Sequence, residues 1–381
     1  MGIFLGSPVP SSGQATGGMR ATAMHIGVVG GGYWGSKHLR VFASMPEVQR
    51  LTLIEQVPEV RKNLVGSFPT VEEAAELDDV IHDLDGVVIA TKPISHVELG
   101  LKAMRAGVHA LIEKPMATSV ADAALLCREA DRSGLVLMAG HTFEFNPAVV
   151  ELKRRIIDGE LGDIHYMRSL RLNLGLYQSD VNVIWDLAPH DVSIINYLLD
   201  EMPTTVTAWG HRSASTDFED VAMIRMEYER SGVDAYVHVS WLDPSKIREV
   251  TVVGSEKMAV YDDVRSQERL RLFDCGVTVP SEDSFQAPMS YRYGDITSPF
   301  IQFDEPLGIE NRHFVEAIRN GRAEKSDGYA GGRVVAAVEA AQRSLQQSQP
   351  ISVAGLIDEL ADPLDFFATV PAGPATIEQI H

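Results

Sequence analysis

Lys114 stands in a setting that could hold its ammonium group for chemistry. It follows the apolar run 108–113 and precedes Pro115. The residue before a proline has a restricted backbone, and bonds to proline adopt the cis form more often than others. A lysine held stiffly at the edge of a ligand cleft could bind a reacting hydroxyl group and stabilise the negative charge that develops on its oxygen. Taken alone, the residue also fits a solvated lysine in a surface loop.

The sequence WDLAPHD at 185–191 offers a carboxylate and an imidazole at helical spacing. Asp186 can cap the helix, and Pro189 is tolerated in its first turn, where backbone N–H groups have no partner within the helix. His190 lies four residues after Asp186, so the two side chains share one helix face. A carboxylate that orients a histidine and raises its basicity makes a general base near neutral pH. A capped helix with a surface histidine would show the same residues.

A glycine-rich segment, MHIGVVGGGYWG at 24–35, predicts a strand, a tight turn and a helix. Gly30 lets the chain leave the strand, Gly32 leaves room for a pyrophosphate, and Gly35 lets the helix pack close to the strand. Free N–H groups at the start of the helix would point at the phosphates, and we expect Tyr33 and Trp34 in the same turn to contact the cofactor. The alternative is a turn between strand and helix that binds no phosphate.

The next apolar run, 51–54, ends at Glu55, twenty residues beyond Gly35. A carboxylate at this point binds the adenosine ribose hydroxyls of a dinucleotide. Because Gln56 and not an arginine follows, the sequence favours NAD over NADP. Arg61 or Lys62 could still reach a 2′-phosphate, so NADP is not excluded.

Alternating strand and helix patterns from 24 to about 142 predict a parallel sheet that helices cover on both faces. Strands are expected at 24–29, 50–54, 86–91, 108–113 and 135–140, and helices at 36–45, 57–65, 71–82, 96–106 and 119–133. Ligands bind beyond the carboxyl ends of such strands. Thr91, Pro93 and His96 follow one of these ends and Glu113 closes another, so we predict that these four residues contact the cofactor.

After His141 the pattern changes to long runs that alternate apolar and polar residues, which predicts an antiparallel sheet with one covered face. The fold class is therefore α/β, with an N-terminal Rossmann sheet and a C-terminal α+β domain that contains a large, open, mostly antiparallel sheet. The expected organisation is a disordered tail at 1–23, a dinucleotide-binding domain at 24–142, a substrate-binding and oligomerisation domain at 143–350 and a tail at 351–381. Expected strands are 164–174, 204–210, 221–228, 233–241, 248–254, 258–262 and 268–273, and expected helices are 147–157, 186–200, 307–320 and 329–347, the last two returning toward the first domain.

The motifs GGGYWG, ATKPISH, EKP and DLAPHD together resemble the glucose-fructose oxidoreductase and inositol dehydrogenase family, known as Gfo/Idh/MocA. The resemblance covers roughly residues 24–350, with the motifs in the family's order. It implies that Lys114 and His190 flank a sugar carbon that exchanges a hydride with nicotinamide, and that Asp186 occupies the motif's acidic position. It also implies a cis bond between Lys114 and Pro115.

A finer similarity, carried by NVIWDLAPHD at 182–191 and SWLDPSKIREVTVVGSEKMAVYDD at 240–263, is to the branch of nucleotide-sugar 3-dehydrogenases. It implies oxidation at C3 of a nucleotide-linked sugar, with Arg171, Asn173 and Asn182 near the sugar and its phosphates. Each of these three residues also fits a solvated position. Related sequences act on sugar phosphates, inositol and TDP-keto sugars, so an NADP-dependent ketoreductase stays open, as does the direction of the reaction.

The composition and charge of the chain limit the kinds of partner that it is expected to bind. The chain has 381 residues, a formal charge of -20 and no concentrated basic patch, which argues against nucleic acid. No apolar run is long enough to span a bilayer, and two cysteines without a paired motif fit a reducing cytoplasm. An open sheet face usually needs a cover, so we expect a homodimer or homotetramer.

Three other functions compete with the enzyme. A protein that binds NAD without redox chemistry would keep the glycine turn and Glu55 but would not need Lys114, Asp186 and His190 together. A metal enzyme is disfavoured because no HExxH or paired-ligand spacing occurs, and no metal is expected. An acyl-transfer hydrolase lacks its GxSxG motif.

Overall fold

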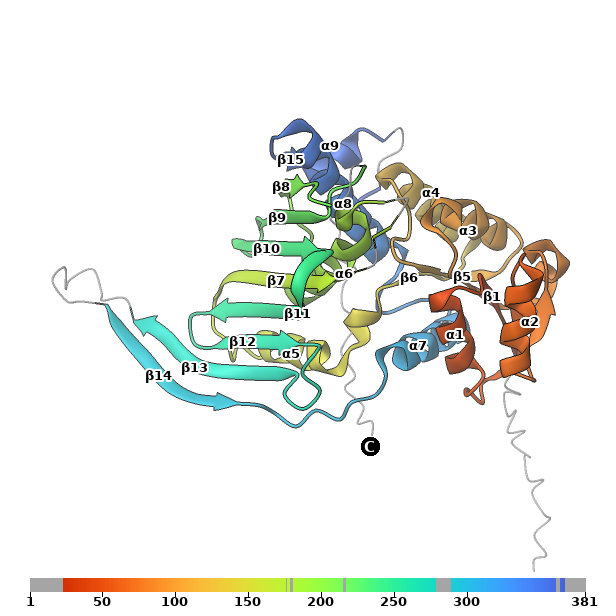
Figure 1. Cartoon of the computed structure of the whole chain (residues 1–381), viewed down its shortest axis with the longest axis horizontal. Coiled ribbons are helices and arrows are strands. Elements are labelled where there is room, and N and C mark those ends of the chain that lie inside the picture. Colours follow the sequence, from red (N-terminus) through yellow and green to blue (C-terminus); the bar gives the residue numbers. More distant parts are fainter. Residues whose placement is uncertain are drawn as a thin grey trace, which may run out of the picture.

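Six parallel strands form the first sheet, in the order β3-β2-β1-β4-β5-β6 (Figure 1). The structure is a computed structural model that describes residues 23–175, 177–178, 181–214, 217–278, 289–360 and 364–366. The tail expected at 1–23 lies almost wholly outside this range. The strands are β1 (Met24–Val29), β2 (Val48–Ile54), β3 (Glu72–Ala74), β4 (Gly86–Ile89), β5 (His109–Glu113) and β6 (Leu137–Gly140).

Helices cover both faces of this sheet, which is why β1 is buried along its whole length. Ile26 and Val28 pack with α1 (Tyr33–Phe42) and with Phe314 of α7 (Pro306–Asn320). Val29 and Ile89 face the side of α3 (His96–Arg105) and α4 (Val120–Ser133). A helix from the far end of the chain therefore completes the first core, as predicted, while α2 (Pro58–Ser67) lies near the edge.

The segment 71–82 differs from its predicted helix. It contains β3 and two short 3-10 helices, η1 (Leu77–Asp79) and η2 (Ile81–Asp83). Buried Val71, Ala74, Leu77 and Ile81 recur every three or four residues, which is the helical pattern. The structure uses them for a strand and two turns, and the Glu76 side chain with that of Asp79 closes the first turn.

A nine-stranded sheet of order β14-β13-β12-β11-β7-β10-β9-β8-β15 forms the second half. All its pairs are antiparallel except β7 with β10. The strands are β7 (Ile164–Leu174), β8 (Thr205–His211), β9 (Val221–Tyr228), β10 (Val233–Ser240), β11 (Leu242–Gly254), β12 (Met258–Asp262), β13 (Leu270–Thr278), β14 (Ser290–Thr297) and β15 (Ile351–Ser352). The sequence analysis missed β14, which is exposed along most of its length, and β15, which is too short to show a pattern.

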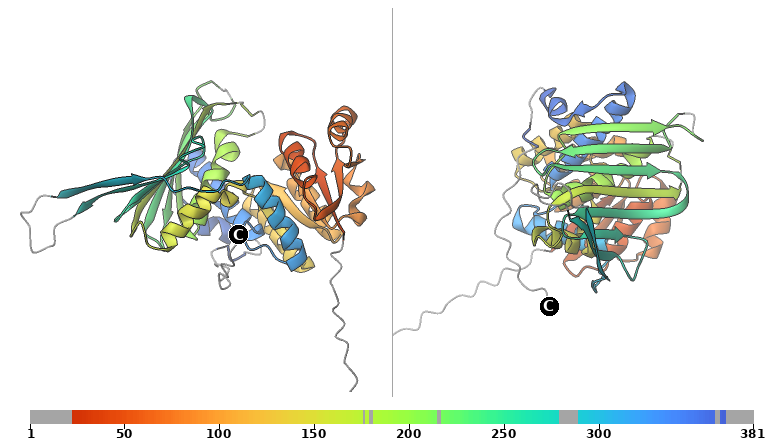
Figure 2. Two further views of the ribbon diagram at one scale, coloured as in Figure 1. Left: turned by 90° about the horizontal axis from the view of Figure 1, so that it is seen from below. Right: turned by 90° about the vertical axis from the view of Figure 1, so that its left-hand side faces the viewer.

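Three helices cover one face of the second sheet, and Figure 2 shows the other face open. They are α5 (Pro147–Ile157), α6 (Val183–Leu199) and α8 (Gly328–Gln347). A further helix, α9 (Val353–Asp358), follows β15, so the segment predicted as a C-terminal tail begins with ordered elements. Among the described residues, no helix is both long and apolar enough to cross a membrane.

Of the three motif glycines between β1 and α1, Gly30 and Gly35 are crowded by neighbouring atoms and Gly32 is open. Gly30 has a φ of 97°, and a Cβ on Gly35 would lie 1.8 Å from the backbone oxygen of Gly30. At both positions only glycine fits. A Cβ on Gly32 would meet nothing within 4 Å. This open side is where the sequence analysis places a pyrophosphate.

Alanine at Gly35 and alanine at Gly32 should therefore affect different properties of the protein. Gly35→Ala forces backbone atoms apart and should destabilise the fold by about 3 kcal/mol or more. Gly32→Ala should leave the melting temperature almost unchanged but weaken NADH binding, because the methyl group enters the space for the phosphates. Thermal unfolding and NADH titration of both variants test this. A Gly32→Ala protein that binds NADH normally would place the phosphates elsewhere.

Candidate active site

Glu55 lies at the carboxyl end of β2, beside the glycine turn. Its Oε2 accepts a hydrogen bond from the backbone N–H of Gly31 (2.6 Å), and its Oε1 accepts one from Val57 (2.8 Å). These donors hold the carboxylate at the position expected for the adenosine ribose. Arg61 donates to the backbone oxygen of Glu55, so part of its guanidinium is engaged by the protein. With the open space beside Gly32, these residues fit NAD.

His96 joins the loops that follow β4 and β5. Its ring nitrogens lie 2.9 Å from the carbonyl oxygen of Pro115 and 3.1 Å from that of Thr91, and the residue is fully buried. The ring bridges two loops inside the protein, and the predicted cofactor contact of His96 stays a prediction. Thr91 and Pro93, the first residue of η3 (Pro93–Ser95), are half-buried at the end of β4, and their cofactor contacts stay predictions.

Glu113 also faces the interior, being only 4% exposed. Its Oε1 lies 3.1 Å from Nε2 of His38, and its Oε2 accepts a hydrogen bond from the backbone N–H of Lys114 (3.0 Å). His38 in turn lies 2.9 Å from Oδ1 of Asn311 on α7. The carboxylate predicted to contact the cofactor instead supports the Lys114 loop against α1 and α7.

Lys114 reaches from the first domain to α6. Its bond to Pro115 is cis, as the family resemblance implies. The Nζ atom donates to the backbone oxygen of Asp186 (2.9 Å) and lies 3.6 Å from the carboxylate Oδ1 of the same residue. The side chain is 12% exposed. A nearly buried ammonium in this position can stabilise a developing negative charge more strongly than one in water.

Helix α6 begins three residues earlier than predicted, so Asn182, and not Asp186, is its N-cap. Asn182 accepts a hydrogen bond from the backbone N–H of Trp185 (3.3 Å), and its amide donates to Glu219 (3.0 Å) and Gln342 (2.7 Å). Both ends of the amide are thus occupied, which corrects the predicted substrate contact of Asn182. The sequence offers two capping residues four positions apart, and tertiary contacts select the first.

Asp186 contacts Lys114 and not His190. Its Oδ2 accepts a hydrogen bond from the indole N–H of Trp241 (2.9 Å), while Oδ1 faces Lys114. Within the described residues, Nδ1 of His190 has no hydrogen-bond partner. The two residues share a helix face as predicted, but the expected pair of carboxylate and imidazole does not form there, because the indole and the ammonium occupy the carboxylate.

His190 is 9% exposed, and its ring meets the ring of Phe143 edge-on, with centroids 5.1 Å apart. Burial, and then the positive charges of Lys114 and Arg171, lower the pKa of His190 well below 6.5. The prediction that Asp186 raises this basicity is therefore wrong. The imidazole is neutral at neutral pH, and a neutral imidazole can accept a proton.

Arg171 forms a buried ion pair with Asp191, with its Nε 2.7 Å from Oδ2. Its guanidinium also lies 4.6 Å from the centre of the Phe143 ring. The side chain is therefore held behind Phe143, where its charge reaches His190, and its Nε and Nη2 are engaged by Asp191, while its substrate contact stays a prediction. Asn173 is half-buried near the end of β7, and its substrate contact stays a prediction.

The sequence analysis missed Phe143, Asp191, Trp241 and Arg248. Phe143 belongs to η4 (Thr142–Phe145), which follows the carboxyl end of β6, so its position along the chain was a usable signal. Trp241 lies in the segment 240–263 that carries the family similarity. Within the described ranges, no group of three or more His, Cys, Asp or Glu side chains is placed to hold a metal ion.

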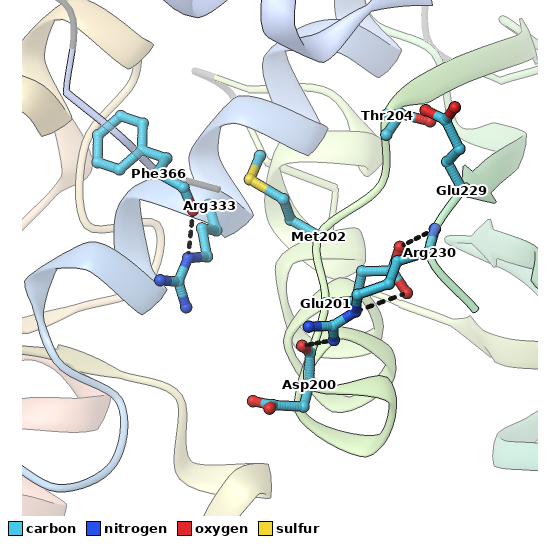
Figure 3. A pocket seen from close by; sticks show the side chains of 8 residues that line it. All are labelled: Asp200, Glu201, Met202, Thr204, Glu229, Arg230, Arg333 and Phe366. Atoms are coloured by element: carbon cyan, nitrogen blue, oxygen red, sulfur yellow. Dashed lines mark hydrogen bonds and ion pairs between the residues drawn. The ribbon is translucent and has the colours of Figure 1, made fainter. Parts of the chain in front are cut away.

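The structure contains two notable cavities, and only the first lies next to the candidate catalytic residues. The first, about 450 Å³ in volume, opens between α1 and the turn from β12 to β13 and is lined by Trp34 and Phe143 among others. The second, about 310 Å³, lies at the opposite end of α6 (Figure 3). There Arg230 binds Glu201 and Arg333 binds Phe366, and none of the predicted site residues is present.

His141 is buried below the site, and neither ring nitrogen has a hydrogen-bond partner in the described structure. Burial lowers its pKa to about 4, despite the opposing charge of Glu113. The unfolded chain takes up a proton on this residue near pH 6.5, before the folded chain does. Folding stability should therefore fall as the pH decreases from about 6.5 to about 4.

His141→Gln should reduce that loss, which amounts to at most about 1.4 kcal/mol per pH unit for one such histidine. The measurement is the free energy of unfolding at about pH 7 and about pH 5. The exposed His82 gives the control variant, His82→Gln, which should keep the wild-type pH dependence. An equal pH dependence in all three proteins would contradict the assignment.

Comparisons with known proteins match both halves of the chain. Residues 24–141 match the oxidoreductase family with an NAD-binding Rossmann fold, and residues 149–260 match the GFO/IDH/MocA C-terminal domain. The UDP-N-acetylglucosamine 3-dehydrogenase of Acidithiobacillus ferrooxidans is 29% identical over 82% of this chain and 95% of its own. Its solved structure, at 24% identity, covers 85% of this chain and 98% of its own with a TM-score of 0.71, a likeness of fold.

Two other relatives match over shorter regions. The inositol 2-dehydrogenase 2 of Saccharopolyspora erythraea is 31% identical over 54% of this chain, and the 4-carboxy-2-hydroxymuconate-6-semialdehyde dehydrogenase of Sphingobium sp. is 28% identical over 46%. The chain spans 63% and 58%, respectively, of the lengths of these two relatives. On the two matched domains, the chain belongs to the GFO/IDH/MocA oxidoreductase family, with an NAD-binding Rossmann domain followed by the C-terminal domain of that family.

Proposed function

We propose that this protein is an NAD-dependent dehydrogenase that oxidises a secondary alcohol, at C3, of a nucleotide-linked sugar. One observation carries the proposal: the charge of the nearly buried ammonium of Lys114 acts on the buried, neutral imidazole of His190 at the carboxyl edge of a dinucleotide-binding sheet. A binding protein without redox chemistry would not need this pair, which is costly to bury.

The two side chains have complementary roles in this proposal. Lys114 binds the oxygen of the reacting hydroxyl group and stabilises the charge that develops on it, and His190 accepts the hydroxyl proton. When bound, NAD supplies the acceptor for the hydride that leaves the same carbon. Asp186 acts as a positioning residue, because its backbone oxygen holds the ammonium and its carboxylate is fixed by Trp241.

The charges around His190 suit the oxidative direction. Lys114, Arg171 and Arg248 all lower its pKa, so the free protein holds it without a proton at neutral pH. Oxidation requires that state, whereas reduction of a ketone requires the protonated form. The same cations favour the alkoxide over the alcohol, which offsets the weak basicity of the imidazole.

Support for a nucleotide-linked sugar comes from the UDP-N-acetylglucosamine 3-dehydrogenase, which matches along 95% of its length. A second candidate substrate class is a cyclic polyol, because the inositol 2-dehydrogenase is slightly more identical, at 31%, over its shorter match. A reducing cytoplasm as the location agrees with the two cysteines, Cys127 and Cys275, which are both free.

Removing the imidazole should abolish most of the turnover. We expect His190→Asn to lower kcat about 100- to 10,000-fold with little change in NADH affinity, since a general base supplies an effect of that size. The assay follows NADH formation from NAD with UDP-linked sugars, TDP-linked sugars, sugar phosphates and inositols. His165→Asn, at an exposed position near the start of β7, is the control. Full activity of the His190→Asn protein would remove this residue from the chemistry.

We also propose that the open face of the second sheet packs against a second copy of the chain. This face carries large exposed side chains on three adjacent strands, among them Trp209 of β8, Met223 of β9 and Tyr236 of β10. Trp209 and Met223 are direct cross-strand partners. The ion pair between Arg225 and Asp234 (2.9 Å) lies beside them, so the face mixes apolar and charged groups, as protein interfaces do.

A carboxylate introduced on this open face should dissociate the oligomer. Trp209→Glu should lower the mass in solution to that of the monomer, because an unpaired carboxylate would be buried at the interface. Size-exclusion chromatography with light scattering measures the mass. Ile157→Glu, at the exposed end of α5, adds a charge away from the sheet and should leave the mass unchanged. A wild-type monomer would exclude the proposed interface.

A further inference from the structure

The cavity between α1 and the turn from β12 to β13, here the α1 groove, adjoins the candidate catalytic residues through Phe143. Phe143 lines the groove, and the same ring contacts His190 edge-on. At the groove, Asp263 pairs with Arg248 (3.4 Å), whose charge also reaches His190. A molecule whose reacting carbon lay at Lys114 and His190 would therefore have room to extend into this groove.

The groove is positively charged in a chain that is strongly negative. Its charged lining consists of Lys37, Arg40 and Arg269 with Asp263 and Glu305. Arg40 pairs with Glu305, and Asp263 is shared between Arg269 and the neighbouring Arg248. The three cations and two carboxylates leave the lining with one excess positive charge, and Arg248 beside it adds a second, although the formal charge of the whole chain is -20.

Arg269 presents an unused hydrogen-bond donor. Its Nη1 donates to the backbone oxygen of Asp263 (3.0 Å), and its guanidinium stacks 3.9 Å from the centre of the Phe303 ring. Its Nε is buried and has no hydrogen-bond partner within the described structure. Such a donor is costly to leave unpaired, and a guanidinium fixed by stacking suits two-point binding of a phosphate.

Lys37 contributes a second cation on the opposite wall. Its Nζ lies 5.3 Å from the centre of the Tyr33 ring, and no ion pair holds it in the described part of the chain. Tyr33 is 72% exposed and Phe303 is 44% exposed, so aromatic surface is open beside both cations. Aromatic faces next to cations are what a base attached to phosphates can stack on.

We propose that the α1 groove binds the diphosphate of the nucleotide-linked sugar, with Arg269 and Lys37 as the cationic contacts that select this substrate class. The assignment rests on the proposed function and deepens it. A sugar or inositol without phosphate would leave Lys37 without an anionic partner and Arg269 with only the Asp263 carboxylate that it shares with Arg248. The pyrophosphate of the cofactor has a separate place at Gly32, where the turn leaves open space.

The test measures binding of UDP to the protein saturated with NADH, by isothermal titration calorimetry. Arg269→Gln should weaken UDP about 10- to 100-fold and Lys37→Gln about 10-fold, the range for hydrogen bonds to charged groups. Arg269→Lys should recover part of the loss because it keeps the charge. Uridine should bind far more weakly than UDP. Arg230→Gln, in the cavity of Figure 3, is the matched control and should bind UDP normally.

The outcomes separate this assignment from the proposed function. UDP binding that depends on Arg269, in a protein that oxidises no sugar, supports the groove and overturns the dehydrogenase. Oxidation of a nucleotide-linked sugar with an unchanged KM in Arg269→Gln supports the dehydrogenase and overturns the groove. Competition between UDP and NADH, or uridine that binds as tightly as UDP, also overturns it. Unchanged NADH affinity and melting temperature show that each variant is folded.

Discussion

The contact between Lys114 and Asp186 is the constraint on which the candidate site depends. It joins residues 72 positions apart, one at the end of β5 and the other in the first turn of α6. An ammonium that is 12% exposed needs a partner, and the backbone oxygen and carboxylate of one residue supply it. The carboxyl edge of the parallel sheet must therefore face the start of α6, and Trp241 at the end of β10 fixes Asp186 in place.

Electrostatics explains why no carboxylate is bonded to the ring of His190. Burial and three nearby cations all disfavour the imidazolium form of His190. A carboxylate bonded to its ring would cancel much of that field, whereas the observed arrangement gives the carboxylate to the ammonium. The imidazole therefore has no carboxylate of its own, and in the proposed reaction the same cations would favour an alkoxide between Lys114 and His190.

The sequence predicted the parts of the site that local rules determine. The glycine turn, Glu55 and most strands follow from spacing and periodicity, and the positions of Lys114 and His190 follow from motifs. Contacts between segments that lie far apart in the sequence could not be predicted from these local rules. His96 and Glu113 looked exposed because they end strands, yet Pro115 and His38 bury them. Asn182 looked free because its partners, Glu219 and Gln342, lie 37 and 160 residues away.

Helix α7 links the catalytic loop to the α1 groove. Its Asn311 bonds to His38, which bonds to Glu113 beneath Lys114, and this chain of contacts is buried throughout. The first residues of the same helix, Pro306 and Leu307, line the groove. A shift of α7 would therefore change the support of the ammonium and the width of the groove together. Because packed interiors transmit such shifts, the proposed substrate would have its reacting carbon and its distal part supported by one and the same helix.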